Sequence, residues 1–152
     1  MRNFLIVCDA SPLIALADIG ELHILKELYQ EVLITDVVRK EILTELPDWI
    51  GVSSDYEPSD FKHLQLQLDA GEASAIALAL KNPGCRLVID ERKGRLVAKA
   101  MGLKIVGLLG VVVKAKELGV ITSGKTILDK LEIHGFWLSE KLKRQLLEKL
   151  GE

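Results

Sequence analysis

Short apolar runs alternate along this chain with longer stretches in which apolar residues recur at helical spacing. The short runs predict buried strands at 4–8, 31–34, 86–89 and 104–106. The longer stretches predict helices at 11–17, 21–28, 36–46, 61–68, 73–81, 91–101, 108–118, 126–131 and 140–150. The turn-rich segment 51–58 predicts a loop with a short edge strand. Because strands separated by helices, without hairpin signals, are typical of parallel sheets, we expect an α/β fold with helices on both faces of a mostly parallel sheet.

The length of 152 residues predicts one domain spanning 1–152, with the last helix, about 140–150, as an appendage or interaction element. A net charge of −2 gives no global basic field, so a nucleic acid would have to be held by a local patch or a bound metal. Cys8 and Cys85 lie in apolar runs and predict buried free thiols, which are typical of a reducing cytoplasm. We find no membrane-spanning stretch and no signal-peptide pattern, and we expect a soluble cytoplasmic protein.

Asp9 directly follows the first predicted strand, and a helix begins shortly afterwards. This places its carboxylate at the carboxyl edge of the sheet, where open α/β folds bind ligands. The alternative is that Asp9 only caps the helix. Ser11, which precedes Pro12, is a good N-cap itself and would leave Asp9 without that structural duty.

Four further acids lie near predicted strand ends or helix starts, and each has a structural alternative. Glu41 lies beside the buried stripe of its helix and could instead be a solvated residue. Glu72 stands three residues after Asp69, in a capping-box spacing. Asp90 and Glu91 follow the third predicted strand, where Asp90 could be an N-cap and Glu91 could be favoured by the helix dipole. Because parallel strands end at one edge, we expect these acids to gather there.

Several carboxylates at one edge repel one another unless a cation neutralises them. Oxygen ligands suit Mg²⁺ or Mn²⁺, and the three histidines have no metal-ligand spacing. Such an ion activates water and stabilises the leaving oxygen in phosphodiester hydrolysis. Consecutive residues at a strand end point in opposite directions, so we expect Asp90 as a ligand and Glu91 as a water-mediated neighbour.

The ordered set Asp9-Ala10-Ser11-Pro12, then Glu41, then Leu68-Asp69-Ala70-Gly71-Glu72, then Ile89-Asp90-Glu91 resembles the PIN-domain family, over roughly residues 3 to 121. Within it, the stretch 95–121 resembles a prokaryotic, toxin-type subgroup. The resemblance implies a three-layer α/β/α sandwich and Mg²⁺- or Mn²⁺-dependent cleavage of single-stranded RNA. It also implies a toxin role beside an antitoxin protein, and we expect a homodimer. By position it implies the catalytic metal ligands Asp9, Glu41, Glu72 and Asp90, with Ser11 assisting.

Two positions depart from the family pattern. The family commonly has Asp where this chain has Glu72, and Thr where it has Ile89. These departures keep a second interpretation open, in which the chain is a weakly active or inactive PIN-like module that binds nucleic acid or protein.

The segment Gly119–Thr126 matches the spacing of a Walker A loop. A phosphate-binding loop requires a preceding strand, whereas 111–118 has the pattern of a helix that ends at Gly119. Thr122 or Ser123 as an N-cap explains the motif without a ligand, so we expect no nucleotide site.

Basic residues flank the predicted acids, and a charged face of this kind is usually only solvated. Arg39, Lys40, Arg92 and Arg95 are nevertheless candidates for contacts with RNA phosphates. We expect the last helix to pack on its own domain, with a dimer or antitoxin groove as the alternative. Trp49 and Trp137 are expected in the core or at its rim.

Overall fold

The computed structural model describes residues 4–152 and contains a five-stranded sheet in that range, in the order β3-β2-β1-β4-β5, with every neighbouring pair parallel. The strands are β1 (Leu5–Cys8), β2 (Glu31–Thr35), β3 (Ile50–Ser53), β4 (Arg86–Val88) and β5 (Lys104–Val106). The predicted parallel α/β fold is confirmed, and β3 is the expected edge strand. The chain builds outward from β1 to β3 and then resumes on the other side with β4, which makes the β1–β4 boundary a topological switch point.

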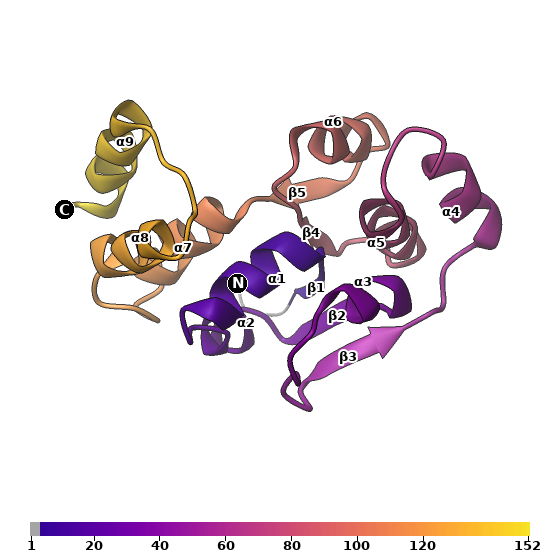
Figure 1. The fold of residues 1–152 in the computed structure, drawn as a ribbon, viewed down its shortest axis with the longest axis horizontal. Helices are drawn as coiled ribbons and strands as arrows, with labels where there is room; N and C mark the ends of the chain where they lie inside the picture. Colours follow the sequence, from indigo (N-terminus) through magenta and orange to yellow (C-terminus); the bar gives the residue numbers. More distant parts are fainter. Residues whose placement is uncertain (1–3) are drawn as a thin grey trace.

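The helices cover most of the chain between and after the strands (Figure 1). They are α1 (Ala10–Asp18), α2 (His23–Leu28), α3 (Asp36–Glu41), α4 (Pro58–Leu64), α5 (Ala70–Lys81), α6 (Arg92–Ala100), α7 (Leu108–Glu117), α8 (Gly124–Ile133) and α9 (Glu140–Leu150). Even α5, with 12 residues, is too short to cross a bilayer, and no other helix within residues 4–152 has the length and hydropathy to do so.

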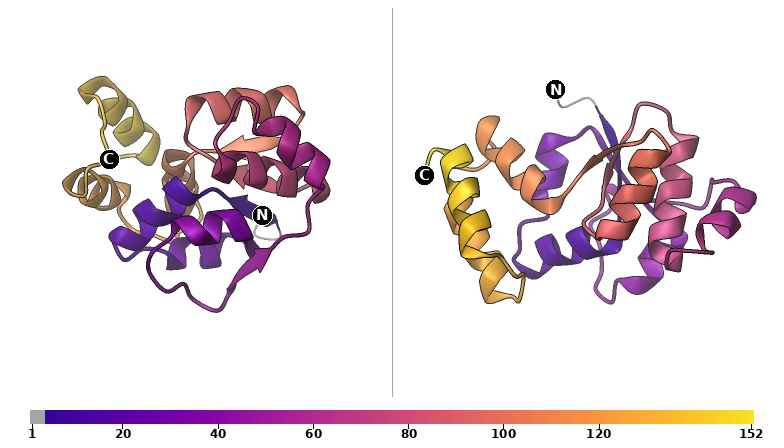
Figure 2. Two further views of the ribbon diagram at one scale, coloured as in Figure 1. Left: turned by 45° about the vertical axis from the view of Figure 1, so that its right-hand side comes forward. Right: turned by 90° about the horizontal axis from the view of Figure 1, so that it is seen from above.

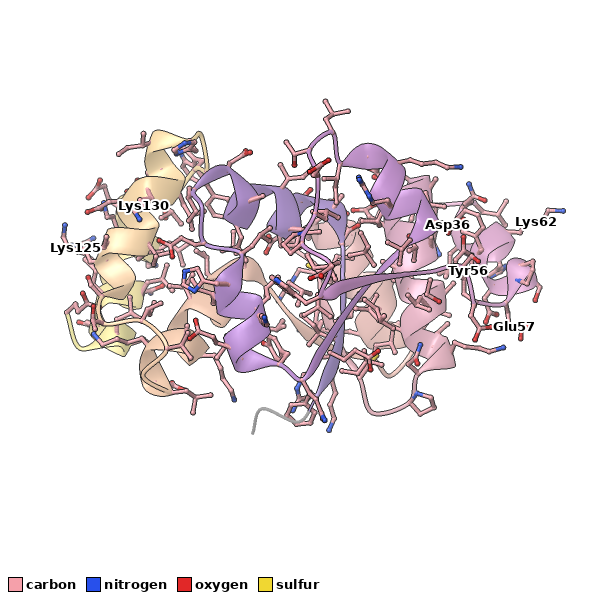
Figure 3. The ribbon with its side chains drawn as sticks, turned by 90° about the horizontal axis from the view of Figure 1, so that it is seen from below. Asp36, Tyr56, Glu57, Lys62, Lys125 and Lys130 are labelled. Carbon is pink, nitrogen blue, oxygen red and sulfur yellow. The ribbon has the colours of Figure 1, made fainter. Side chains whose placement is uncertain are left out.

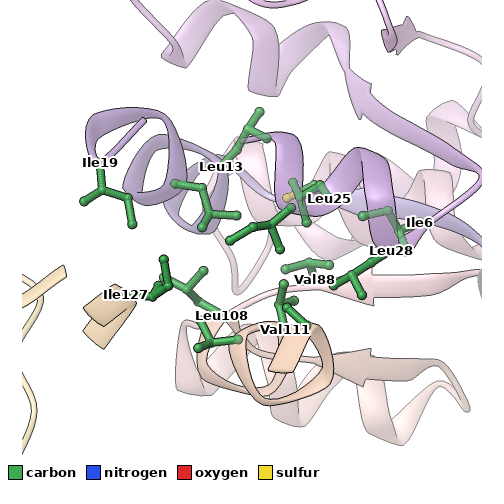
Figure 4. Close-up of a cluster of buried hydrophobic side chains, with 14 of the residues drawn as sticks. Ile6, Leu13, Ile19, Leu25, Leu28, Val88, Leu108, Val111 and Ile127 are labelled. Carbon is green, nitrogen blue, oxygen red and sulfur yellow. The ribbon is translucent and has the colours of Figure 1, made fainter. Parts of the chain in front are cut away.

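Alternate residues of each strand face opposite layers, which produces two separate apolar clusters. Ile6, Cys8 and Val88 face α1, α2 and α7, with α8 and α9 completing that cluster. Figure 4 shows Leu13 and Leu25 meeting Val88 and Val111 there. Val7 and Leu87 face the other way, toward α4, α5 and α6. Helices therefore lie on both sides of the sheet, as Figure 2 shows from two further directions, in an α/β/α arrangement.

The predicted helix 36–46 is wrong in its second half, because α3 ends at Glu41. Ile42 is extended, with φ −101° and ψ 117°, and its side chain is buried. The Arg39 guanidinium donates a hydrogen bond of 3.0 Å to the Ile42 carbonyl, which satisfies a group that the helix leaves without a partner. Burial of one apolar side chain thus decides where the helix stops, and it leaves Glu41 at the helix end.

Candidate metal centre

Asp9 lies at the carboxyl end of β1 and is only 4% exposed. Its backbone N–H donates to the Val88 carbonyl at 2.9 Å, which extends the pairing of β1 with β4 by one residue. The prediction that Ser11 is the N-cap is wrong: Asp9 occupies that position, and α1 begins at Ala10. Even so, the Asp9 side chain makes no capping hydrogen bond, so its carboxylate is left for another role.

Burial and neighbouring negative charges make the ionised form of Asp9 unfavourable. Together they raise the pKa of Asp9 to about 6. Burial contributes most, and the carboxylates of Asp69, Glu41 and Asp90 raise the pKa further. The Ala10 backbone N–H acts in the opposite direction and lowers it. Three carboxylates thus lie close enough to Asp9 for their negative charges to act on it.

Asp90 follows β4 on the other side of the switch point. Its Oδ1 accepts a hydrogen bond of 2.8 Å from the Leu108 backbone N–H at the start of α7. Arg95 donates to the Ile89 carbonyl at 2.8 Å. Burial raises the pKa of Asp90, although the Leu108 N–H and the Arg95 charge act to lower it. A Cβ at Gly107 would lie 2.9 Å from both Asp90 Oδ1 and Arg95 Nη1, so a glycine there leaves room for both groups.

Glu91 turns away from Asp90 and caps the next helix. Its Oε2 accepts a hydrogen bond of 2.9 Å from the Gly94 N–H. The backbone N–H groups of Gly94 and Lys93 lower the pKa of Glu91. The two adjacent carboxylates thus have different partners, Leu108 for Asp90 and Gly94 for Glu91, which agrees with the expectation that they diverge.

Glu72 is 7% exposed in the first turn of α5. Half of the predicted capping box is present, because Asp69 Oδ1 accepts the Glu72 N–H at 2.8 Å. The Glu72 carboxylate lies instead toward Gly94, whose added Cβ would be 3.5 Å from Glu72 Oε2. Burial, followed by the charges of Asp69 and Glu91, raises the pKa of Glu72 to about 8. A residue that only capped the helix would not need its carboxylate in a buried position beside two other negative charges.

Glu41 reaches the same helix from the end of α3. A Cβ on Gly71 would overlap the Glu41 carboxylate, with the Glu41 Cδ only 3.0 Å away. Gly71 is therefore the residue that lets this carboxylate rest on the first turn of α5. Burial and the charge of Asp69 raise the pKa of Glu41.

Two buried hydroxyls tie the start of α3 to the start of α5. Thr35 Oγ1 accepts from the Val38 N–H at 2.9 Å, and Ser74 Oγ donates to the Gly71 carbonyl at 2.8 Å. The two hydroxyls are 2.7 Å apart. Because the single Ser74 hydrogen is used on Gly71, Thr35 must be the donor between them. This chain of bonds fixes the helices that carry Glu41 and Glu72 relative to each other.

Asp69 is the member of the cluster that the sequence interpretation missed. It was assigned only as a partner in the capping box, yet its charge raises the pKa values of Asp9, Glu41 and Glu72. The signal for it was available, since Asp69 immediately precedes the helix that carries Glu72.

The donor chemistry of this cluster suits a hard divalent cation, since all of its groups are carboxylates. As the side chains lie within residues 4–152, however, no three of Asp, Glu, His or Cys are arranged to ligate one ion together. The carboxylates therefore suit such an ion for two reasons: they supply oxygen ligands, and their negative charges repel one another when no cation is bound. Binding requires the carboxylates to close around the ion.

The basic residues named as RNA candidates divide into two kinds. Lys40 and Arg92 are exposed. Arg39 and Arg95 are half-buried, and each donates to a backbone carbonyl, of Ile42 and Ile89 respectively. Arg39 and Arg95 thus also fix the backbone next to Glu41 and Asp90.

The Walker-like segment is preceded by the helix α7, and its anion-binding groups are used by the chain itself. Glu152 accepts hydrogen bonds from Ser123 Oγ and the Gly124 N–H, each at 2.8 Å, and pairs with Lys116 at 2.9 Å. Lys116 and Ser123 lower the pKa of Glu152 to about 2. Lys125 turns outward at the exposed end of the molecule (Figure 3) and pairs with Asp129, one helical turn further along.

Lys125→Ala should therefore leave any RNA cleavage unchanged, and ATP should not bind measurably. Glu152→Ala should lower the melting temperature, because it leaves the start of α8 without its anion. Calorimetry and thermal melts measure both effects. Micromolar ATP affinity that disappears in Lys125→Ala would contradict this assignment.

In comparison with known proteins, a family model described as a PIN domain matches residues 5–152. No curated protein and no solved structure was found to match the chain.

Proposed function

The chain belongs to the PIN-domain family, whose members are generally nucleases, and on that premise we propose that it is a divalent-metal-dependent ribonuclease acting on single-stranded RNA. The observation that carries the proposal is the pair Asp9 and Asp90. They lie on either side of the switch point, both largely withdrawn from water and both with raised pKa values. A structural role alone would favour an apolar residue at the position of Asp9, whose buried side chain makes no capping hydrogen bond.

Asp9, Glu41, Glu72 and Asp90 would hold Mg²⁺ or Mn²⁺, with Glu91 beside them. The bound ion would supply the Lewis acid and the activated nucleophile that phosphodiester hydrolysis requires. Asp90 is oriented by the Leu108 N–H, and Glu41 is seated on Gly71. Ser11, which is exposed in the first turn of α1, would assist them. Lys40 and Arg92 would neutralise phosphates of the RNA strand.

The biological setting extends this proposal. A toxin paired with an antitoxin protein, working as a homodimer in the cytoplasm, agrees with the family resemblance and with the two buried free thiols, Cys8 and Cys85. A small antitoxin-like reading frame adjacent to the gene would support the toxin role.

A non-catalytic binding module is the second candidate, and one observation favours it: the carboxylates do not form a closed ligand set. The purified chain separates the two candidates. We expect it to cleave single-stranded RNA with Mn²⁺ or Mg²⁺ and to stop when EDTA is added. Metal-independent cleavage, or RNA binding without any cleavage in Mn²⁺, would refute the nuclease.

Asp90→Asn should reduce Mn²⁺ binding and cleavage far more than Glu91→Gln. Asp90 lies two residues after β4 and has a short side chain that the Leu108 N–H orients, whereas the longer Glu91 side chain is exposed and caps α6 through the Gly94 N–H. Calorimetric Mn²⁺ titration and initial cleavage rates give the ranking. The reverse order would mean that Glu91, and not Asp90, is the fourth metal ligand.

Gly71→Ala should reduce cleavage by about 10²-fold, because the new methyl group displaces the Glu41 carboxylate by about an ångström. The fold should tolerate it, since alanine favours a helix by about 0.5–1 kcal/mol over glycine. A double-mutant cycle supplies the control. In a Glu41→Gln background, Gly71→Ala should hardly reduce cleavage further. If the two substitutions instead lower the cleavage rate independently, so that their free-energy effects add, the contact between Gly71 and Glu41 is disproved.

A further inference from the structure

An open pocket of about 270 Å³ lies between α1 and the end of α8. Its wall on α1 consists of residues spaced as one helix face: Ser11, Ile14, Ala15 and Asp18. Its other wall is the end of α8 and the turn that follows: Leu131, His134, Gly135 and Phe136. Ser11 lies in the first turn of α1, two residues after Asp9 in the chain, and this is the end of the pocket that is nearer in sequence to the acidic cluster.

Trp137 follows the second wall of this pocket directly and is 81% exposed. The expectation that it lies in the core or at its rim is wrong, whereas Trp49 does pack against the core. Ile133, at the end of α8, is equally exposed at 80%. The exposed Trp137 indole has a free π face on which another ring can stack.

The edge of the pocket is polar although its walls are largely apolar. His134 Nδ1 lies 3.0 Å from the Lys130 carbonyl oxygen, which can only accept, so Nδ1 carries the hydrogen. In the neutral ring, Nε2 is then an acceptor. With the Ser11 hydroxyl and the Asp18 carboxylate, the rim offers both donors and acceptors. A heteroaromatic ring matches this combination, while an aliphatic side chain would desolvate these groups without replacing their hydrogen bonds.

We propose that Trp137 and this pocket form a subsite that stacks one unpaired nucleobase of the substrate, next to the phosphodiester bond at the acidic cluster. This inference rests on the proposed nuclease function and identifies a determinant of its substrate class. Bases within a duplex have no free face, so a stacking platform selects single strands.

Fluorescence titration in EDTA tests the subsite without cleavage. In a Trp49→Phe background, Trp137 is the only indole, and a 12-nucleotide oligoadenylate should quench it while a 12-base-pair duplex should not. Trp137→Leu retains apolar bulk but loses the π face, and affinity measured with a labelled oligonucleotide should fall about 5- to 100-fold. Trp137→Phe should restore part of that loss. Ile133→Ala, the equally exposed neighbour, should bind as the parent does.

Three results would overturn the subsite: absence of quenching, unchanged affinity in Trp137→Leu, or an equal loss in Ile133→Ala. A change in oligomeric state of Trp137→Leu with unchanged oligonucleotide affinity would identify the surface as a protein interface instead. Binding is measured without metal, so the two proposals can fail separately. If the oligonucleotide quenches Trp137 but is not cleaved when Mn²⁺ is added, the nuclease is refuted and the subsite is supported. Cleavage unaffected by Trp137→Leu refutes the subsite alone.

Discussion

Asp9→Asn should abolish Mn²⁺-dependent RNA cleavage, reducing the rate by about 10³-fold or more, which corresponds to about 4 kcal/mol of transition-state stabilisation. The substitution keeps the shape of the side chain and removes the charge that attracts the metal. Asp9 is also central to the cluster, since the charges of Asp69, Glu41 and Asp90 all act on it.

The loss in Asp9→Asn should not come from unfolding. A neutral amide removes like-charge repulsion, so the metal-free variant should be as stable as the wild type or more stable at pH 7. Asp48→Asn makes the same chemical change at an exposed loop position and serves as the control for cleavage. Full activity in Asp9→Asn, or equal losses in the two variants, would refute the assigned role of Asp9.

The metal-free protein should become less stable as the pH rises from about 4 to about 8. A carboxyl whose pKa is raised by folding binds its proton more tightly in the folded state, so stability is lost as that proton leaves. For Asp9 the loss begins near its ordinary pKa of 3.8 and is complete above about 6; the shift corresponds to about 3 kcal/mol. Glu72, with its pKa raised to about 8, extends the decline to higher pH.

Urea denaturation in EDTA at pH 5, 6, 7 and 8 measures this dependence. Asp9→Asn should flatten the part below pH 6 and leave the part due to Glu72. Mn²⁺ should restore stability most at pH 8, where the carboxylates are ionised, since a ligand that binds only the folded state stabilises it. Stability that rises from pH 5 to pH 8 without metal would contradict the electrostatic account of the cluster.

Asp9, Glu72 and Asp90 could be singled out from the sequence because local patterns connect each of them to a strand end or a helix start, whereas Glu41 lies at the end of α3. Asp9 follows an unbroken buried run, and the parallel topology, inferred from strands alternating with helices, brings it beside Asp90. The prediction for Ser11 failed because the N-cap lies two residues earlier, at Asp9, which occupies that position without a side-chain capping hydrogen bond.

Features that depend on tertiary contacts were beyond the sequence. The end of α3 at Glu41 is set by the burial of Ile42. The need for Gly71 becomes clear only when the Glu41 carboxylate lies against it, because a glycine near a helix start has no local signature of close approach. The capture of Glu152 by the start of α8 joins residues 28 positions apart, which no motif spacing encodes.

A crystal soaked in Mn²⁺ and measured at the manganese absorption edge shows whether the acidic cluster holds a metal ion. We expect an anomalous peak between Asp9 and Asp90, with Glu41 and Glu72 turned toward it from their present positions, and no peak in Asp9→Asn. A wild-type crystal without a peak at millimolar Mn²⁺, or one with its peak away from these carboxylates, would contradict this expectation.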